Sequence, residues 1–292
     1  MKICIYGAGA FGFVLARHFG NKLIDYKNHE VVLYGREQKV LEHIKNKRTH
    51  PYHFPKTKMP LNVVVTNDVR RAVMNSDIII LAVPSGAIRG VCDSLKQLIT
   101  NDCVIVNTAK GLELESGKRL SEIITASLGD IGFDIDVACF SGGTPAEEMA
   151  EDVVLGAEVA SKNRHVVERL VNLFSTNNLK VYGNLDISGI EYAGAFKNVV
   201  VILDGILDGM KFSLGTKTFL ISRAARQAAV LAVQLGANPR TYTCGSQGWE
   251  NDLWLSCFSS YIIYLKARLN NFRISQISPF RHKSSKEHNI KI

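Results

Sequence analysis

A chain of 292 residues, 46% of them hydrophobic, is long enough to form two packed domains, each with its own core. It has no run of about 18 uncharged apolar residues, so no membrane span is expected. The first expected strand begins at the second residue, which leaves no room for a cleavable leader. These features favour a cytoplasmic protein.

The net charge of +8 is unevenly distributed along the chain. Residues 261–292 contain seven Lys or Arg and one acid, Glu287, so only about +2 belongs to the rest. A solvated basic tail explains this pattern better than a nucleic-acid-binding arm, because the tail has neither aromatic interleaving nor a recognised motif. We therefore expect no nucleic-acid partner.

The cysteines have no paired spacing, and several of them lie inside apolar runs. The six are Cys4, Cys92, Cys103, Cys139, Cys244 and Cys257. This pattern predicts buried thiols rather than a disulfide framework or a zinc site, and we expect no bound metal.

The chain begins with alternating strand and helix signals, the order of a βαβ unit. The first expected elements are a strand at 2–6, a helix at 13–19 and a strand at 30–34. Further strands are expected at 63–66, 77–83, 103–108, 137–140, 153–160 and 179–182, and helices at 69–75, 88–98, 120–128 and 165–177. Near-continuous apolar strands alternating with helices predict a parallel sheet covered on both faces.

The pattern changes after residue 185. Apolar residues recur with helical spacing at 187–207 and 218–236, and no strand signal returns. The predicted fold class is therefore α/β, with an N-terminal Rossmann-type doubly wound sheet followed by an all-α C-terminal domain. We place the sheet domain at 1–185, the helical domain at 186–260 and the basic tail at 261–292.

The first strand runs directly into a glycine turn, Gly7-Ala8-Gly9-Ala10-Phe11-Gly12. Gly7 allows the tight turn, Gly9 leaves room for a pyrophosphate against bare backbone, and Gly12 lets helix and strand pack closely. The phosphates then meet the free N–H groups and the positive end of the following helix. The turn predicts a bound dinucleotide, NAD or NADP; the alternative is a turn that merely connects two elements.

The end of the second strand bears on the choice of cofactor. An NAD-selective site usually has an acid there that bonds the ribose 2′-hydroxyl. Here the strand ends in Tyr34-Gly35-Arg36, with Glu37 one position late. The Arg36 guanidinium could accept a 2′-phosphate, which makes NADP admissible beside NAD, unless Arg36 is an ordinary surface residue.

Two lysines occupy positions suited to chemistry. Lys110 follows an apolar strand, at the edge where open α/β sheets bind ligands. Lys197 lies in the middle of an otherwise apolar helix, where burial would lower its pKa toward a range useful for proton transfer. A structural ion pair, or a side chain whose ammonium reaches solvent, would explain Lys197 equally well. Asp252 and Ser256 are four residues apart and would share one face of a helix, which suits recognition of a hydroxyl. A surface pair or an N-cap would give the same pattern.

Together these segments resemble the bacterial type of NAD(P)-dependent glycerol-3-phosphate dehydrogenase, from Met1 to about Phe258. The matching segments are Gly7–Gly12, Tyr34-Gly35-Arg36, Ala82-Val83-Pro84-Ser85, Ala109-Lys110-Gly111, Ser141-Gly142-Gly143-Thr144-Pro145-Ala146-Glu147-Glu148, Gly194-Ala195-Phe196-Lys197-Asn198-Val199, Leu220-Ile221-Ser222-Arg223 and Asp252-Leu253. Their order and spacing are more specific than any single segment.

The resemblance implies reversible hydride transfer between NAD(P)H and dihydroxyacetone phosphate, which gives sn-glycerol 3-phosphate for phospholipid synthesis. It implies that Lys197 donates a proton to the substrate carbonyl. It further implies that Lys110 and Asn198 orient the substrate and that Asp252 and Ser256 bond its hydroxyl end. Cofactor contacts are implied for the glycine turn, Arg36, Pro84, Lys110 and Ala146, and a homodimer is a possible assembly.

The chain also departs from the family pattern. Family members usually read Gly-Pro-Ser-Phe where this chain has Gly142-Gly143-Thr144-Pro145, and an Arg-Asn-Arg run where it has Tyr261-Ile262-Ile263. The second change removes a charge-assisted phosphate contact. A frameshifted or truncated gene, or a lineage-specific tail, would account for it. The alternatives are thus a cofactor-binding but catalytically impaired family member, and a related β-hydroxyacid or ketopantoate-type dehydrogenase.

Overall fold

The computed structural model describes residues 1–258, so the basic tail and the segment Tyr261-Ile262-Ile263 lie outside the described residues. An eight-stranded sheet with the order β3-β2-β1-β4-β5-β6-β7-β8 forms the first part of the chain. The strands are β1 (Lys2–Tyr6), β2 (Glu30–Tyr34), β3 (Val63–Thr66), β4 (Ile78–Leu81), β5 (Cys103–Asn107), β6 (Ile135–Gly143), β7 (Leu155–Ser161) and β8 (Leu179–Asn184). This confirms the Rossmann-type sheet followed by helices.

Helices cover both faces of the sheet. They are α1 (Ala10–Lys22), α2 (Gln38–Lys47), α3 (Val69–Val73), α4 (Ile88–Leu95), α5 (Leu120–Leu128), α6 (Ala146–Ala150) and α7 (Arg164–Phe174). Because side chains alternate along a strand, Ile3 and Ile5 pack in one core with α1, α2 and α7. Cys4 and Tyr6 pack in the opposite core with α3, α4 and α5. Strand β4, between β1 and β5, is therefore apolar at every position, and Ile78–Leu81 is wholly buried.

The register brings the carboxyl ends of the central strands to one edge. Tyr6 pairs with both Tyr34 and Leu81, and Leu81 pairs with Asn107. The turns that follow β1, β2, β4 and β5 consequently lie side by side, at the edge where open α/β sheets bind ligands.

The expectation of a wholly parallel sheet is wrong at one position. Strand β7 runs antiparallel to β6, while β7 and β8 are parallel. The connection between β6 and β7 is residues 144–154, which include only the one-turn helix α6. A connection this short cannot cross over to a parallel strand, so the chain reverses instead.

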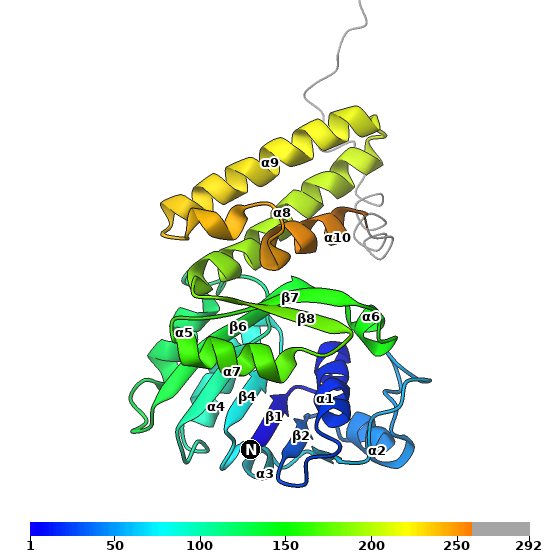
Figure 1. The fold of residues 1–292 in the computed structure, drawn as a ribbon, viewed down its shortest axis with the longest axis vertical. Helices are drawn as coiled ribbons and strands as arrows, with labels where there is room; N and C mark the ends of the chain where they lie inside the picture. The colour runs from blue at the N-terminus through cyan, green and yellow to red at the C-terminus, as the bar shows by residue number, and fades with distance from the viewer. Residues whose placement is uncertain (259–292) are drawn as a thin grey trace, which may run out of the picture.

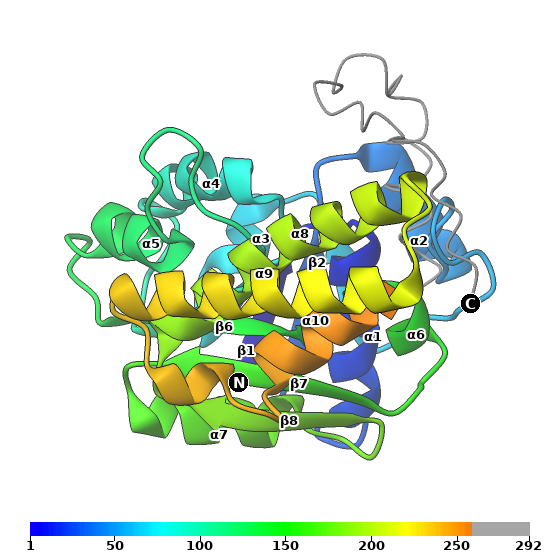
Figure 2. The same cartoon turned by 90° about the horizontal axis from the view of Figure 1, so that it is seen from above.

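The last described segments are helical and lie beyond the end of the sheet (Figure 1). Helix α8 (Ile187–Gly209) and helix α9 (Leu214–Gln234) are followed by a one-turn π-helix at Gln247–Asn251 and by α10 (Asp252–Phe258). Seen from above, α9 and α10 lie over the sheet (Figure 2). None of the helices in residues 1–258 is long and apolar enough to cross a membrane.

A buried carboxylate attaches α8 to the sheet part. Glu191 accepts hydrogen bonds from Ser121 N at 2.7 Å, from Ser121 Oγ at 2.5 Å and from Arg119 Nη1 at 3.3 Å. Both partners lie at the start of α5. The first turns of α8 are thereby fixed to a helix that packs on the sheet.

The cysteines agree with the expected burial except at one position. Cys4, Cys92, Cys103, Cys139 and Cys257 are buried, whereas Cys244 is exposed. Cys244 precedes Gly245 in the loop before the π-helix, outside any apolar run, so the expectation of a buried thiol is wrong there.

Candidate functional site

The glycine turn joins β1 to α1 with backbone that excludes side chains at two of its positions. Gly7 has φ +127°, and a Cβ on it would overlap the carbonyl oxygen of Ala82 on the neighbouring strand. A Cβ on Gly12 would overlap the carbonyl oxygen of Gly7. Helix α1 therefore starts directly against the sheet edge, as a close helix–strand junction requires.

Gly9 has the opposite environment. It is exposed, and a Cβ on it would meet no heavy atom within 4 Å. Gly9 is the N-cap of α1, no side chain caps the helix, and its first turn contains no acid. Open backbone at the positive end of a 13-residue helix fits a pyrophosphate, so the residues present suit a dinucleotide.

A pocket of about 340 Å³ lies beside this turn, at the carboxyl ends of β1, β2 and β4. Its lining includes Gly7, Ala8, Gly9, Arg36 and Pro84, all of them expected cofactor contacts, together with His50, Tyr52 and His53. Arg36 is exposed and therefore free to meet a ligand. Of the remaining expected contacts, Ala10, Phe11 and Ala146 are partly buried and pack against the core on the α1 side of the sheet.

His50 was missed by sequence reasoning. Its Nε2 lies 3.1 Å from the carbonyl oxygen of Ala8, so Nε2 carries the proton and donates. Its Nδ1 accepts from the backbone N–H groups of Tyr52 and His53 at 3.3 Å each. Burial lowers the pKa of His50, which favours this neutral form. The only signal in the sequence was the concentration of His and aromatic residues at 50–54.

Lys110 is held at the same edge by the turn after β5. The Asn107 side chain accepts from Ala109 N at 3.0 Å, which shapes the turn, and Gly111 follows with φ +130°. The Lys110 ammonium donates to the carbonyl oxygen of Gly142 at 3.1 Å and to Asp252 Oδ2 at 2.5 Å. Lys110 is thus tied to both the sheet and α10.

Lys197 reaches the same carboxylate from α8. Its ammonium donates to Asp252 Oδ1 at 2.7 Å and to Ser256 Oγ at 2.7 Å. Only 6% of Lys197 and 2% of Asp252 are exposed. Burial lowers the pKa of Lys197, the nearby Lys110 lowers that pKa further, and Asp252 opposes both effects. We call Lys110, Lys197, Asp252 and Ser256 the lysine–aspartate cluster.

The cluster brings together Lys197, the expected proton donor, and three of the four expected substrate residues, Lys110, Asp252 and Ser256. The fourth, Asn198, is not part of it. Asn198 is exposed, and no hydrogen bond links it to the cluster within residues 1–258. The ion pair that the sequence left as an alternative for Lys197 is present, and the lowered pKa that proton transfer requires accompanies it. The two interpretations of Lys197 are therefore compatible.

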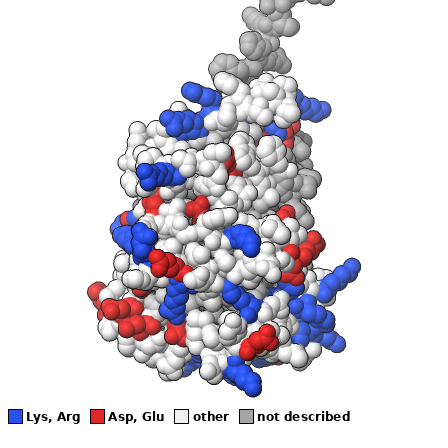
Figure 3. Space-filling model, in the orientation of Figure 1, with Lys and Arg blue, Asp and Glu red and all other residues white. Residues whose placement is uncertain are grey.

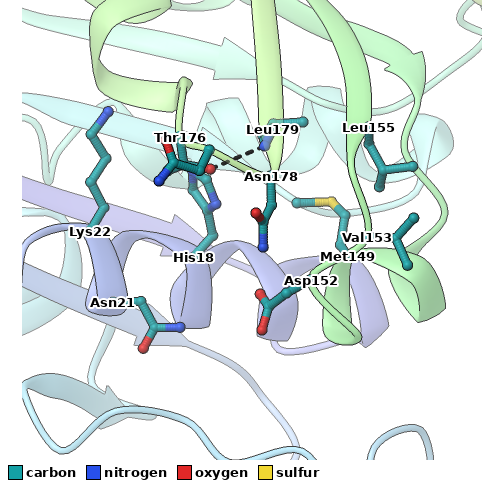
Figure 4. A pocket seen from close by; sticks show the side chains of 11 residues that line it. His18, Asn21, Lys22, Met149, Asp152, Val153, Leu155, Thr176, Asn178 and Leu179 are labelled. Carbon is teal, nitrogen blue, oxygen red and sulfur yellow. Dashed lines mark hydrogen bonds between the residues drawn. The ribbon is translucent and has the colours of Figure 1, made fainter.

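The described residues hold no group of three His, Cys, Asp or Glu side chains suited to a metal. A second hollow, of about 330 Å³, lies between α1, α6 and the β7–β8 connection (Figure 4). Its polar groups bond within the fold: His18 Nε2 donates to the carbonyl oxygen of Phe174 at 2.8 Å, and Asp152 pairs with Arg17 at 2.6 Å. We therefore do not choose this hollow as the site.

The charge pattern of the described surface is mixed. On the face shown in Figure 3, Lys and Arg side chains are interspersed with Asp and Glu side chains. Seven of the chain's positive side chains belong to residues 261–292, outside the described residues.

Comparisons with known proteins agree with this geometry. The sequence profile of the NAD-dependent glycerol-3-phosphate dehydrogenase N-terminus matches residues 2–167, and that of the C-terminus matches residues 186–262. The chain is 35% identical to glycerol-3-phosphate dehydrogenase [NAD(P)+] of Clostridium acetobutylicum over 89% of this chain and 75% of that protein. It is 34% identical to the enzyme of the same name from Thermoanaerobacter sp., over 89% and 74%.

A solved structure gives the same result. The crystal structure of glycerol-3-phosphate dehydrogenase from Coxiella burnetii superimposes with a TM-score of 0.81 at 26% identity, and the match covers 93% of this chain and 78% of that one. The fold, the profiles and the relatives all point to one group of enzymes. This chain belongs to the NAD-dependent glycerol-3-phosphate dehydrogenase family.

Proposed function

We propose that this chain interconverts dihydroxyacetone phosphate and sn-glycerol 3-phosphate with NAD(P)H and supplies the product for phospholipid synthesis. The observation that carries the proposal is the lysine–aspartate cluster, with two ammonium groups on one buried carboxylate. The cluster lies where the turn after β5 meets α8 and α10, at the same sheet edge as the glycine turn.

Lys197 is the proton donor in this proposal. When bound, the reduced cofactor supplies the hydride. The Lys197 ammonium then gives one proton to the carbonyl oxygen, so that ketone, hydride and proton together make the alcohol. Burial of Lys197 weakens its hold on the proton, while Asp252 keeps the ammonium form populated before the transfer.

Lys110 and Asp252 fulfil the electrostatic and positioning roles. Negative charge develops on the carbonyl oxygen as the hydride arrives, and an ammonium group fixed nearby stabilises that charge more than it stabilises the neutral ketone. The bonds from Lys110 to Gly142 and Asp252 hold it in place without reorganisation. Lys110 and Asn198 are also assigned to orienting the substrate, and Asp252 and Ser256, both bonded to Lys197, to its hydroxyl end.

Arg36, the glycine turn, Pro84, Lys110 and Ala146 are assigned to NAD or NADP. The exposed guanidinium of Arg36 in the pocket beside Gly9 supports tolerance of a 2′-phosphate.

Three further assignments accompany the reaction. We propose a sheet domain at 1–185, a helical domain at 186–260 and a tail at 261–292; the interval between the end of β8 and the start of α8 supports the first boundary. A homodimer is supported by the exposed apolar side chains Val199, Phe212, Leu214 and Phe219 on and between α8 and α9. A cytoplasmic location is supported by six free cysteines, because the cytosol keeps thiols reduced. The expectation of no nucleic-acid partner is supported by the mixture of Lys, Arg, Asp and Glu side chains on the face shown in Figure 3.

A steady-state assay tests the function. Purified protein is expected to oxidise NADH or NADPH in the presence of dihydroxyacetone phosphate, and Lys197→Ala is expected to stop turnover while cofactor binding, measured by fluorescence, remains. A 2-keto acid, tested with NADH or NADPH, and a 3-hydroxy acid, tested with NAD+ or NADP+ because it can only be oxidised, serve as comparison substrates. Cofactor binding without turnover, or faster turnover of either acid, would overturn the proposal.

A further inference from the structure

A second buried carboxylate lies outside the lysine–aspartate cluster. Glu158 is on β7, between Ala157 and Val159, and only 6% of it is exposed. A carboxylate in such a position is costly unless it is fully hydrogen-bonded. No Lys, Arg or His in residues 1–258 forms a salt bridge with Glu158. Its charge must therefore be met by neutral donors.

Four neutral donors form hydrogen bonds with the Glu158 carboxylate, and three of them belong to residues 246–248. Glu158 Oε1 accepts from Gln247 N at 2.7 Å, from Ser246 Oγ at 3.1 Å and from Gly248 N at 3.2 Å. Its Oε2 accepts from Asn184 Nδ2 at 3.0 Å. Backbone N–H groups at the start of a helical turn have no partner within the turn, so Glu158 acts as a cap supplied from β7, 88 residues before Ser246.

The capped turn leads directly to the site. The π-helix Gln247–Asn251 ends at Asp252, the first residue of α10. Asn251 N donates to the carbonyl oxygen of Ser246 at 3.0 Å, the wide spacing of a π turn, a feature often found at functional sites. A Cβ on Gly248 would lie 2.7 Å from Ile190 of α8, so the turn is wedged between β7 and α8.

We infer that Glu158 is a positioning residue for the proposed reaction: by capping the turn at 246–248 it sets where the Asp252 carboxylate meets Lys197 and Lys110. The inference rests on the proposed function, because it assigns Glu158 a role in that same site. Glu158 touches neither lysine. It acts through the three residues, 249–251, that join Gly248 to Asp252.

The protonation of Lys197 reports on this role. The charged groups that face Lys197 are Asp252 from α10 and Lys110 from the turn after β5, and Ser256 adds a hydroxyl. Only Asp252 favours the ammonium form. Loosening the cap moves Asp252 away from Lys197 and leaves burial and Lys110 unopposed. Lys197 should then lose its proton at a lower pH, and the basic limb of the kcat profile for ketone reduction should move the same way.

Glu158→Ala removes the cap and Glu158→Gln keeps an acceptor oxygen for the three donors of the turn. We expect Glu158→Ala to lower kcat about 10-fold and to move the basic limb down by about one pH unit, with KM for the cofactor unchanged within about twofold. In Glu158→Gln, kcat should lie within about threefold of the unsubstituted protein, and the basic limb within a fraction of a pH unit of its original position. Ser246→Ala is a second, milder variant that keeps the Glu158 carboxylate: it removes one donor to Glu158 and the acceptor for Trp249 N, and a smaller shift of the same sign is expected.

Asp152→Asn is the matched control. It neutralises a carboxylate that pairs with Arg17 on α1, away from the cluster. It is expected to lower the melting temperature without moving the basic limb. A basic limb that stays in place in Glu158→Ala and Ser246→Ala, or that moves equally in Asp152→Asn, would show a structural role alone and would overturn the inference.

A readout besides turnover separates this inference from the proposed function. The protonation of Lys197 can be followed by nuclear magnetic resonance of isotope-labelled lysine side chains, with Lys197→Met identifying the signal. If the unsubstituted protein has no turnover but the Lys197 titration still falls in Glu158→Ala, the proposed function fails and the positioning role stands. If turnover is present and the titration does not respond to either variant, the positioning role fails and the proposed function stands.

Discussion

The glycine turn and the lysine–aspartate cluster lie at the same edge of the sheet but are built in opposite ways. The turn occupies six consecutive residues, and its defining property is bare backbone, with overlap at Gly7 and Gly12 and open space at Gly9. The cluster depends on side chains that are far apart in the chain, since 142 residues separate Lys110 from Asp252. The turn is fixed by the geometry of neighbouring residues, whereas the cluster is fixed by ion pairs between residues that are far apart in the sequence.

The difference predicts how each site fails. Added side-chain atoms should disable the turn. At Gly9 they would take the space proposed for the phosphates, and at Gly7 or Gly12 they would overlap backbone at the sheet edge. Removing charge disables the cluster, because Lys197 and Asp252 are buried and each relies on its partner. The substitutions below test this contrast.

The largest effect is expected from Lys197→Met. We expect kcat for dihydroxyacetone phosphate reduction to fall about 1000-fold, because the proton donor is lost. The folded structure should persist, since Asp252 keeps its bond to Lys110. Lys22→Met, which alters a lysine outside the cluster, should stay within about twofold of the unsubstituted protein. A fall of less than about tenfold in Lys197→Met would contradict the role of proton donor.

The next effect concerns His18, a buried base. Its ring bonds a backbone carbonyl, that of Phe174, whereas Lys197 bonds the carboxylate of Asp252. Burial lowers the pKa of His18 from 6.5 to about 4, so the folded state keeps it neutral. At pH above 6.5 both the folded and the unfolded state hold it neutral. Between pH 6.5 and 4 only the unfolded state gains a proton, so stability should fall by up to about 3 kcal/mol across that window.

Urea unfolding at pH 7.5 and pH 4.5 measures the effect of His18. His18→Gln should lose less stability than the unsubstituted protein on acidification, because glutamine can still donate to Phe174 and does not titrate. Equal losses in the two proteins would contradict the assignment.

Gly9→Val tests the turn at its open position. Its β-region backbone accepts valine, and nothing in the fold lies within 4 Å of the added Cβ. We expect an unchanged melting temperature with NADH affinity lower by about 100-fold, or about 2.7 kcal/mol. Gly12→Ala, one turn away, should instead destabilise the fold, because the added carbon overlaps the Gly7 carbonyl. Fluorescence titration and thermal unfolding distinguish the two outcomes, and equal behaviour of the variants would refute the contrast.

The smallest effect is expected at Arg36, in the pocket beside the glycine turn. Arg36→Ala should weaken NADPH binding about tenfold and NADH binding about twofold, because only NADPH carries a phosphate for the guanidinium. The ratio of the two dissociation constants, measured at one ionic strength, is the readout. A ratio that does not change would make Arg36 an ordinary surface residue.

The same contrast explains what could be predicted from the sequence. The glycine turn is a local pattern between a strand and a helix, and its position at the end of β1 was predicted correctly. Lys197 was recognised as unusual because a charge interrupts an apolar helix. Its partner could not be identified, because nothing local to Lys197 indicates that α10 folds back over α8.

The strand and helix errors have equally physical causes. Strand β6 extends to Ile135–Gly143, beyond the expected 137–140, because Asp136, Ser141 and the two glycines interrupt its apolar run. Helix α2 was missed, because only Val40, Leu41 and Ile44 of its ten residues are buried. The reversal at β7 depends on the length of the connection before it, which periodicity alone does not measure.

The bond between Glu191 and the start of α5 also has a mechanical consequence. A helix held near one end rotates about that end, so displacement grows with distance from the fulcrum. At 1.5 Å per residue, Lys197 lies about 9 Å along α8 from Glu191, whereas Gly209 lies about 27 Å away. Any swing of the helical part against the sheet would move Gly209 about three times as far as Lys197. Lys197, the proposed proton donor, would thus stay almost stationary over the sheet edge while the far end of α8 absorbs most of the motion.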